Sequence, residues 1–132
     1  MPGMDADART AFLAAPRTGV LATVDASGRA HAVPVWYRFA DGAFRIITDR
    51  GSAKHRNIER TVRATLCIDE REGAFAHVTA EGPVEIAGEV TYDERLALHA
   101  FYRGSERAKA IVDRGGHERM VLLILRPERW YS

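Results

Sequence analysis

Residues 18–49, TGVLATVDASGRAHAVPVWYRFADGAFRIITD, contain three β-rich runs separated by two short turn sequences. The expected strands lie at residues 18–24, 29–39 and 43–49. DASG and ADG, which separate these strands, are typical of hairpin turns. Pro34 has no backbone N–H to donate to a neighbouring strand, so we expect it at a sheet edge or a bulge. The stretch therefore predicts an antiparallel meander.

The sequence on either side of this meander adds three strands and three helical stretches. The strands are expected at residues 61–70, 74–88 and 118–130, and the helices at residues 4–15, 52–60 and 91–115. Ser52 is the expected N-cap of the second helix. Thr91 and Glu94 have the spacing of a capping box at the start of the third. Gly104 is expected to break that third helix into two pieces.

Two further signals shape the second half of the chain. REG at residues 71–73 predicts a turn, and EGP inside the strand at 74–88 predicts a bulge or bend. The last strand is almost continuously apolar, which indicates burial on both faces. Six antiparallel strands with short flanking helices predict a mainly β (α+β) fold in which the sheet forms a small barrel.

The composition predicts one ordinary globular domain that spans residues 1–132. Nineteen Lys and Arg residues against 18 Asp and Glu residues give a net charge of +1, which argues against non-specific nucleic-acid binding. No apolar run approaches the ~18 residues of a membrane-spanning helix. The N-terminal residues lack the apolar segment of a signal peptide. We therefore expect a cytoplasmic protein that binds neither membranes nor nucleic acid.

The common signatures of catalytic and metal sites are missing from the sequence. The five histidines lack metal-ligand spacing, and no cysteine pair accompanies them, so we predict no metal site. Neither a G-x-S-x-G motif nor a Gly-rich phosphate loop occurs. The single cysteine, Cys67, lies in the apolar run RATLCID, and we expect it in the core as a small hydrophobic residue. No catalytic side chain can be named from the sequence.

RIITDRGSAKHRNI, residues 45–58, is the stretch in which a strand gives way to a short basic helix. Helix N-termini attract anions through their free N–H groups and the helix dipole. Ser52 adds a hydroxyl at this N-terminus, Lys54 adds a cation in the first turn, and Thr48 ends the strand. A cation in a first turn is unfavourable unless an anion or solvent compensates it. The pattern thus predicts either a phosphate cradle or a solvent-facing basic helix.

The order of these motifs resembles that of the flavin-binding split β-barrel superfamily. This superfamily contains the pyridoxamine 5′-phosphate oxidase-like proteins and their relatives that use the deazaflavin coenzyme F420. The similarity spans roughly residues 8–130 and is carried by GVLATVDASGRAHAVPVWYRF, FRIITDRGSAKHRNIERTVRATLCID and VTAEGPVEI. It implies a six-stranded antiparallel split β-barrel with short flanking helices, assembled as a homodimer that shares its cofactors.

The resemblance also implies which residues form the cofactor site. Thr48, Ser52 and Lys54 match positions that hold the cofactor phosphate. The strand expected to line the tricyclic ring contributes Val33, Pro34, Val35 and Trp36. Asn57 matches a position at the junction of helix and barrel. An acidic F420 tail would find cations at Arg50, Arg56 and Arg60, whereas FMN has no such tail.

The expected function is that of a homodimeric oxidoreductase that transfers hydride to a small organic acceptor. Coenzyme F420 is the first choice of cofactor because the compact chain and the SAKHRNI run resemble that branch, and FMN is the second. The alternatives are an FMN-binding relative of pyridoxamine 5′-phosphate oxidase, a non-catalytic cofactor- or haem-binding protein, and a structural dimer without a ligand.

Overall fold

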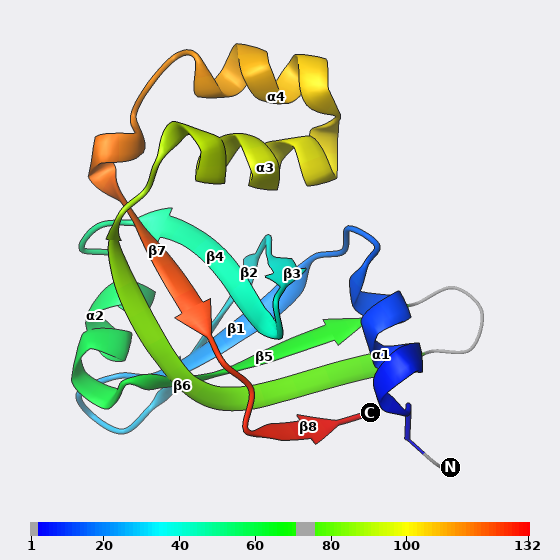
Figure 1. The fold of residues 1–132 in the computed structure, drawn as a ribbon. Coiled ribbons are helices and arrows are strands. Elements are labelled where there is room, and N and C mark those ends of the chain that lie inside the picture. The colour runs from blue at the N-terminus through cyan, green and yellow to red at the C-terminus, as the bar shows by residue number, and fades with distance from the viewer. Residues whose placement is uncertain (1–2, 71–75) are drawn as a thin grey trace.

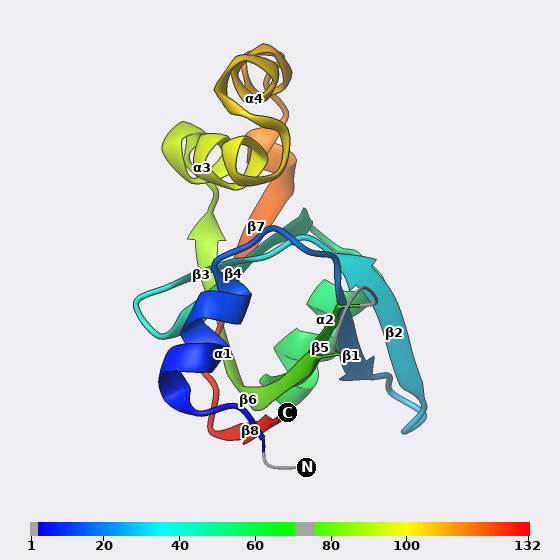
Figure 2. The same ribbon diagram turned by 90° about the vertical axis from the view of Figure 1, so that its right-hand side faces the viewer.

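The structure, a computed structural model, describes residues 3–70 and 76–132 and shows a strongly curled antiparallel sheet (Figures 1 and 2). In the described part the strands are β1 Gly19–Val24, β2 Ala30–Val35, β3 Arg38–Ala40, β4 Ala43–Asp49, β5 Arg63–Asp69, β6 His77–Glu89, β7 Met120–Leu125 and β8 Arg129–Tyr131. The α-helices there are α1 Ala6–Leu13, α2 Ala53–Thr61, α3 Tyr92–Arg103 and α4 Ser105–Val112, with a 3₁₀ turn at His117–Arg119. None of these helices is both long and apolar enough to cross a membrane.

The strand order is β2-β1-β5-β6-β7-β4-β3, with β8 paired to β6. Two strands that follow each other in the chain, β2 and β3, thus lie at opposite ends of the sheet, which curls to bring its ends round (Figure 2). Pro34, paired with Val20 in β1, lies on the edge strand β2, as its missing N–H predicts. The mainly β split-barrel fold is confirmed.

The expected number of six strands is wrong, because two of the predicted strands are each divided. The strand expected at 29–39 breaks at Trp36 and Tyr37. There the backbone bonds to a helix side chain instead of a neighbouring strand, because the Tyr37 N–H donates to Tyr102 Oη over 3.0 Å. The strand expected at 118–130 breaks around Pro127, which has no N–H to donate. The turn expected at 71–73 lies outside the described residues.

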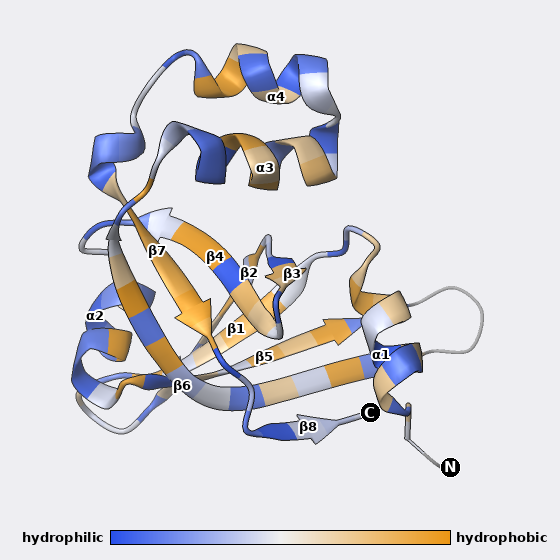
Figure 3. Cartoon of the chain, viewed as in Figure 1, coloured by the Kyte–Doolittle hydropathy of each residue, from blue (hydrophilic) through white to orange (hydrophobic). Residues whose placement is uncertain are grey.

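The core fills the inside of the curled sheet. Its largest fully buried side chains include Tyr37, Phe44, Leu21, Ile46, Leu66, Ile68, Leu123 and Leu125. Along β7 every residue from Val121 to Leu125 is buried, so the predicted burial on both faces is confirmed, and Figure 3 shows this strand hydrophobic along its length. Cys67 is exposed, contrary to expectation, because β5 alternates and directs Leu66 and Ile68 inward.

The long strand β6 bends sharply and joins the two halves of the sheet (Figure 1). Of the bulge or bend expected at EGP, the bulge is absent, since pairing with β5 continues regularly through Gly82 and Pro83. Directly after EGP the strand changes its partner, from β5 at Pro83 to β7 at Val84. The irregularity lies further on, between Ile86 and Glu89. Gly82 is needed for a different reason: a Cβ placed there would lie 2.1 Å from the carbonyl oxygen of Arg126.

The helices begin where the sequence predicts. Ser52 caps α2 by accepting a hydrogen bond from the His55 N–H, and Thr91 caps α3 by accepting one from the Glu94 N–H over 3.1 Å. Gly104, with a φ of 86°, separates α3 from α4 as expected. These two helices pack together as a hairpin above the sheet (Figures 1 and 2).

We expect Gly82→Ala to lower the free energy of unfolding by about 3 kcal/mol, because the new methyl group forces two backbones apart. Urea denaturation followed by circular dichroism measures this change. Glu85→Ala is the matched control on the same strand, since Glu85 is half exposed and pairs with Arg126 at the surface. The control should change stability by less than about 1 kcal/mol. Equal stability of the two variants would contradict the close-approach explanation.

Candidate functional site

A cavity of about 330 Å³ lies where the ends of β2 and β4 meet α2 and α3. Its lining residues come from five elements and are Pro34, Val35, Trp36, Ile47, Thr48, Asp49, Lys54, Arg95, Leu98, His99 and Met120. The strand ends and the first turn of α2 form one side, and α3 supplies the other. The cavity falls at the small end of the size range of ligand pockets, roughly 300–1,000 Å³.

The structure brings most of the predicted cofactor-binding residues together in this cavity. Those that line it are Pro34, Val35, Trp36, Thr48 and Lys54. Val33 instead packs against the barrel core, and Arg56 lies on the exposed face of α2. Ser52 Oγ caps the helix and lies 3.2 Å from Thr48 Oγ1, so it borders the site through Thr48.

Two buried polar side chains fix α2 against the barrel. Asn57 Nδ2 donates to Thr23 Oγ1 in β1 over 3.0 Å, which is the junction role that the resemblance implied. His55 Nδ1 accepts the Gly51 N–H over 2.9 Å and so holds the turn before the helix. His55 therefore serves the structure, and of the three consecutive basic residues only Lys54 reaches the cavity.

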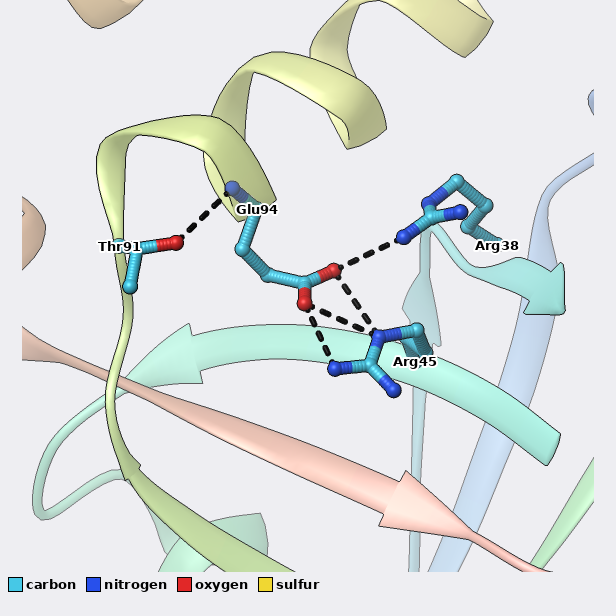
Figure 4. Close-up of polar contacts among 4 residues, drawn as sticks. All are labelled: Arg38, Arg45, Thr91 and Glu94. Carbon is cyan, nitrogen blue, oxygen red and sulfur yellow. Dashed lines mark hydrogen bonds and ion pairs between the residues drawn. The ribbon is translucent and has the colours of Figure 1, made fainter. Parts of the chain in front are cut away.

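An ion-pair cluster anchors the start of α3 to the sheet (Figure 4). The Glu94 carboxylate accepts from Arg45 over 2.7 Å and from Arg38 over 3.2 Å. The predicted capping box is therefore only half formed, because this carboxylate turns to the arginines instead of the Thr91 N–H. The hydrogen bonds from Arg45, above all, hold the pKa of Glu94 below its usual value.

The end of α3 is anchored by aromatic packing. The rings of Tyr102 and Trp36 stack with centroids 4.4 Å apart and an interplanar angle of 2°. Tyr102 Oη accepts the Tyr37 N–H and lies 2.7 Å from the carbonyl oxygen of Arg17. Burial raises the pKa of the Tyr102 phenol. One face of Trp36, the residue expected against a cofactor ring, is thus already covered.

Arg95 and His99 of α3 line the cavity, and the sequence analysis missed both. Arg95 is 6% exposed and donates through Nη1 to the carbonyl oxygen of Gly115 over 2.8 Å. Burial, and then the charges of Arg95 and Arg103, lower the pKa of His99. The i, i+4 spacing of Arg95 and His99, which places both on one face of the helix, was the sequence signal that could have identified them. The apolar residues Leu96 and Ala100 of the same helix line a groove between α3 and α4.

The lining groups define what the cavity can bind. Lys54 and Arg95 offer positive charge and Thr48 a hydroxyl, while Pro34, Leu98 and the indole of Trp36 offer apolar surface. Among the lining residues that the structure describes, Asp49 is the acidic one. Within residues 3–70 and 76–132 no three metal-ligating side chains gather. This combination suits a ligand that carries an anionic group beside an apolar, planar one.

The chain matches, over residues 6–132, the family described as pyridoxamine 5′-phosphate oxidase. It belongs to that family. Among solved structures, a conserved hypothetical protein of Mycobacterium tuberculosis is similar at 25% identity, with a TM-score of 0.83 over 96% of this chain and 82% of that one. No curated protein sequence matches.

Two other similar structures share the fold but carry different names. An F420 reductase is 20% identical, with a TM-score of 0.70 over 92% of this chain and 94% of that one. HutZ, the haem storage protein of Vibrio cholerae, is 17% identical, with a TM-score of 0.73 over 96% and 93%. Membership of the pyridoxamine 5′-phosphate oxidase family therefore fixes the fold and leaves the ligand to be argued from the site.

We expect Glu94→Gln to destabilise the protein by about 1–3 kcal/mol at neutral pH, because two arginines lose a charged acceptor. The folded-state pKa of Glu94 lies below its unfolded value of about 4.5, so the stability it provides is present above that value and disappears as the pH falls. Denaturant titrations between pH 7 and 3 measure both effects. The wild type should lose its advantage over the variant below about pH 4.5; a constant difference across this range would contradict the ion-pair account.

Proposed function

We propose that the protein is a homodimeric oxidoreductase that binds a flavin-type cofactor in this cavity and passes hydride to a small organic acceptor. Coenzyme F420 is the preferred cofactor and FMN the alternative. The observation that carries the proposal is the placement of Lys54 and Thr48 together in the lining, beside the N-terminus of α2. A cation in the first turn of a helix requires compensation, and a phosphate supplies it.

Different residues of the cavity fit the phosphate and the ring of such a cofactor. Lys54 and Thr48 would hold the phosphate, and the wall beside the ring would be formed by Pro34 and Val35 at the end of β2 and by Trp36 directly after it. When bound, a flavin-type cofactor supplies the two-electron chemistry. The protein contributes binding, orientation and exclusion of water, and no side chain of the cavity is assigned as a proton donor.

The placement of the arginines favours F420 over FMN. Arg60 already donates to the carbonyl oxygen of Val24, so it is less suited to an acidic tail than expected. Arg50 and Arg119 line a neighbouring surface cavity of about 380 Å³ together with Asp49. Asp49 also lines the main cavity, so the two are adjacent. Cations beside the phosphate site would suit an acidic tail, which FMN lacks.

The outer face of the sheet supports the proposed homodimer. Pro34, Val20 and Cys67 are register partners on the three neighbouring strands β2, β1 and β5, and all are exposed. Val24 extends the same apolar patch and is 45% exposed. Contiguous exposed apolar surface of this kind marks interaction sites. Pro34 belongs to both the patch and the cavity lining, so a second copy docked there would border the cofactor site.

Lys54→Ala should weaken cofactor binding by more than about tenfold with little change in melting temperature, because a charge-assisted bond to phosphate contributes about 1.5–3 kcal/mol. Titrations with FMN and with F420, followed by cofactor fluorescence, measure the affinities. Lys109→Ala is the matched control, since Lys109 is the only other lysine and lies exposed on α4. Wild-type affinity in Lys54→Ala would exclude the phosphate cradle.

Val20→Glu should convert the dimer into a monomer and weaken cofactor binding, because a buried carboxylate in an apolar interface is unfavourable. Light scattering coupled to size-exclusion chromatography gives the mass. Ala110→Glu introduces the same charge on the exposed surface of α4 and should leave both properties unchanged. A wild-type protein that is monomeric and yet binds cofactor tightly would refute the shared site.

A further inference from the structure

Arg95 is a buried cation with no ion-pair partner among the described residues. Its side chain is 6% exposed, and no carboxylate lies within ion-pair distance of it in residues 3–70 and 76–132. Its Nη1 donates to the carbonyl oxygen of Gly115, whereas its Nε is fully buried with no acceptor in the described structure. A buried, unpaired charge is costly, so proteins keep one chiefly where a ligand neutralises it.

A second unpartnered nitrogen lies on the same wall. His99 Nδ1 is also buried without a hydrogen-bond partner among the described residues, and both side chains line the cavity. The two residues are four apart on α3 and therefore share one helical face. Of the seven buried side-chain atoms without a partner in the described residues, these two belong to side chains that line one cavity, where a polar ligand would supply the missing partners.

We infer that Arg95 is a second cation for the bound phosphoryl group, acting from α3 together with Lys54 of α2. This inference rests on the proposed cofactor site and adds to it a residue that determines specificity. An arginine binds two phosphate oxygens through its planar edge, whereas a lysine acts as a single point charge. Two cations and the Thr48 hydroxyl, drawn from three elements, match the double charge of a phosphate better than the single charge of a carboxylate.

The consequence is discrimination against ligands that lack the phosphate. Such a ligand leaves the guanidinium of Arg95 buried and unpaired, which is the most effective way for a site to reject an analogue. Arg95 is a binding residue in this account and takes no part in bond making. Arg95 also donates to the carbonyl oxygen of Gly115, which is a structural contact. If this contact were the whole role of Arg95, its loss would lower the affinity for every ligand equally, with or without a phosphate.

The test compares wild type, Arg95→Gln and Arg95→Lys, with Arg107→Gln as the matched control on the exposed surface of α4. Inorganic phosphate, FMN, F420 and riboflavin, which has no phosphate, are the probes, and affinities come from calorimetry and cofactor fluorescence. We expect Arg95→Gln to weaken phosphate binding and binding of the preferred cofactor by about tenfold or more. Riboflavin affinity should stay the same or rise, because Arg95→Gln no longer leaves an unpaired guanidinium beside that ligand, and Arg95→Lys should fall between wild type and Arg95→Gln.

Unchanged phosphate affinity in folded Arg95→Gln, or in Arg95→Lys if the glutamine variant does not fold, would overturn the inference. Equal losses for FMN and riboflavin would also overturn it, because they would indicate a structural role. If the wild type binds inorganic phosphate through Arg95 but neither cofactor, the inference stands and the proposed function fails. If the wild type binds a cofactor and the Arg95 variants bind it equally well, the function stands and the inference fails.

Discussion

The carboxylate of Glu94, held between Arg45 and Arg38, sets the position of α3 over the sheet. A helix is rigid, so fixing one of its residues fixes the direction of the next turn as well. Arg95 and His99 consequently border the cavity, and Tyr102 reaches Trp36 at the far end. Both walls of the site are thus held before any ligand arrives, which lowers the entropic cost of binding.

The sequence predicts those parts of the fold that depend on neighbouring residues. The hairpins, the helix caps at Ser52 and Thr91 and the break at Gly104 all follow from local chemistry. The break at Tyr37 does not, because its cause is a hydroxyl 65 residues further along the chain. Cys67 was misplaced for a related reason: apolar neighbours suggest burial, but strand alternation decides which side chains point inward.

The residues of the candidate site can likewise be divided into those that the sequence predicts and those that only the tertiary structure reveals. Thr48 and Lys54 lie within one short stretch, where the junction of strand and helix is visible in the residue types. Arg95 offered only its i, i+4 spacing with His99, and a charged residue on a helix is normally exposed. Only the tertiary contact of Glu94 with Arg45 reveals that the helix turns Arg95 towards the cavity.

The α3–α4 hairpin leaves the sheet and returns to it between two strands that pair directly. Glu89 at the end of β6 is the register partner of Val121 in β7, so the chain re-enters almost where it departed. Insertions at such points are tolerated because the barrel core does not depend on them. A different hairpin at this point would give the same barrel a new wall, and with it a new ligand preference, provided that it supplied new partners for Tyr37, Arg38 and Arg45.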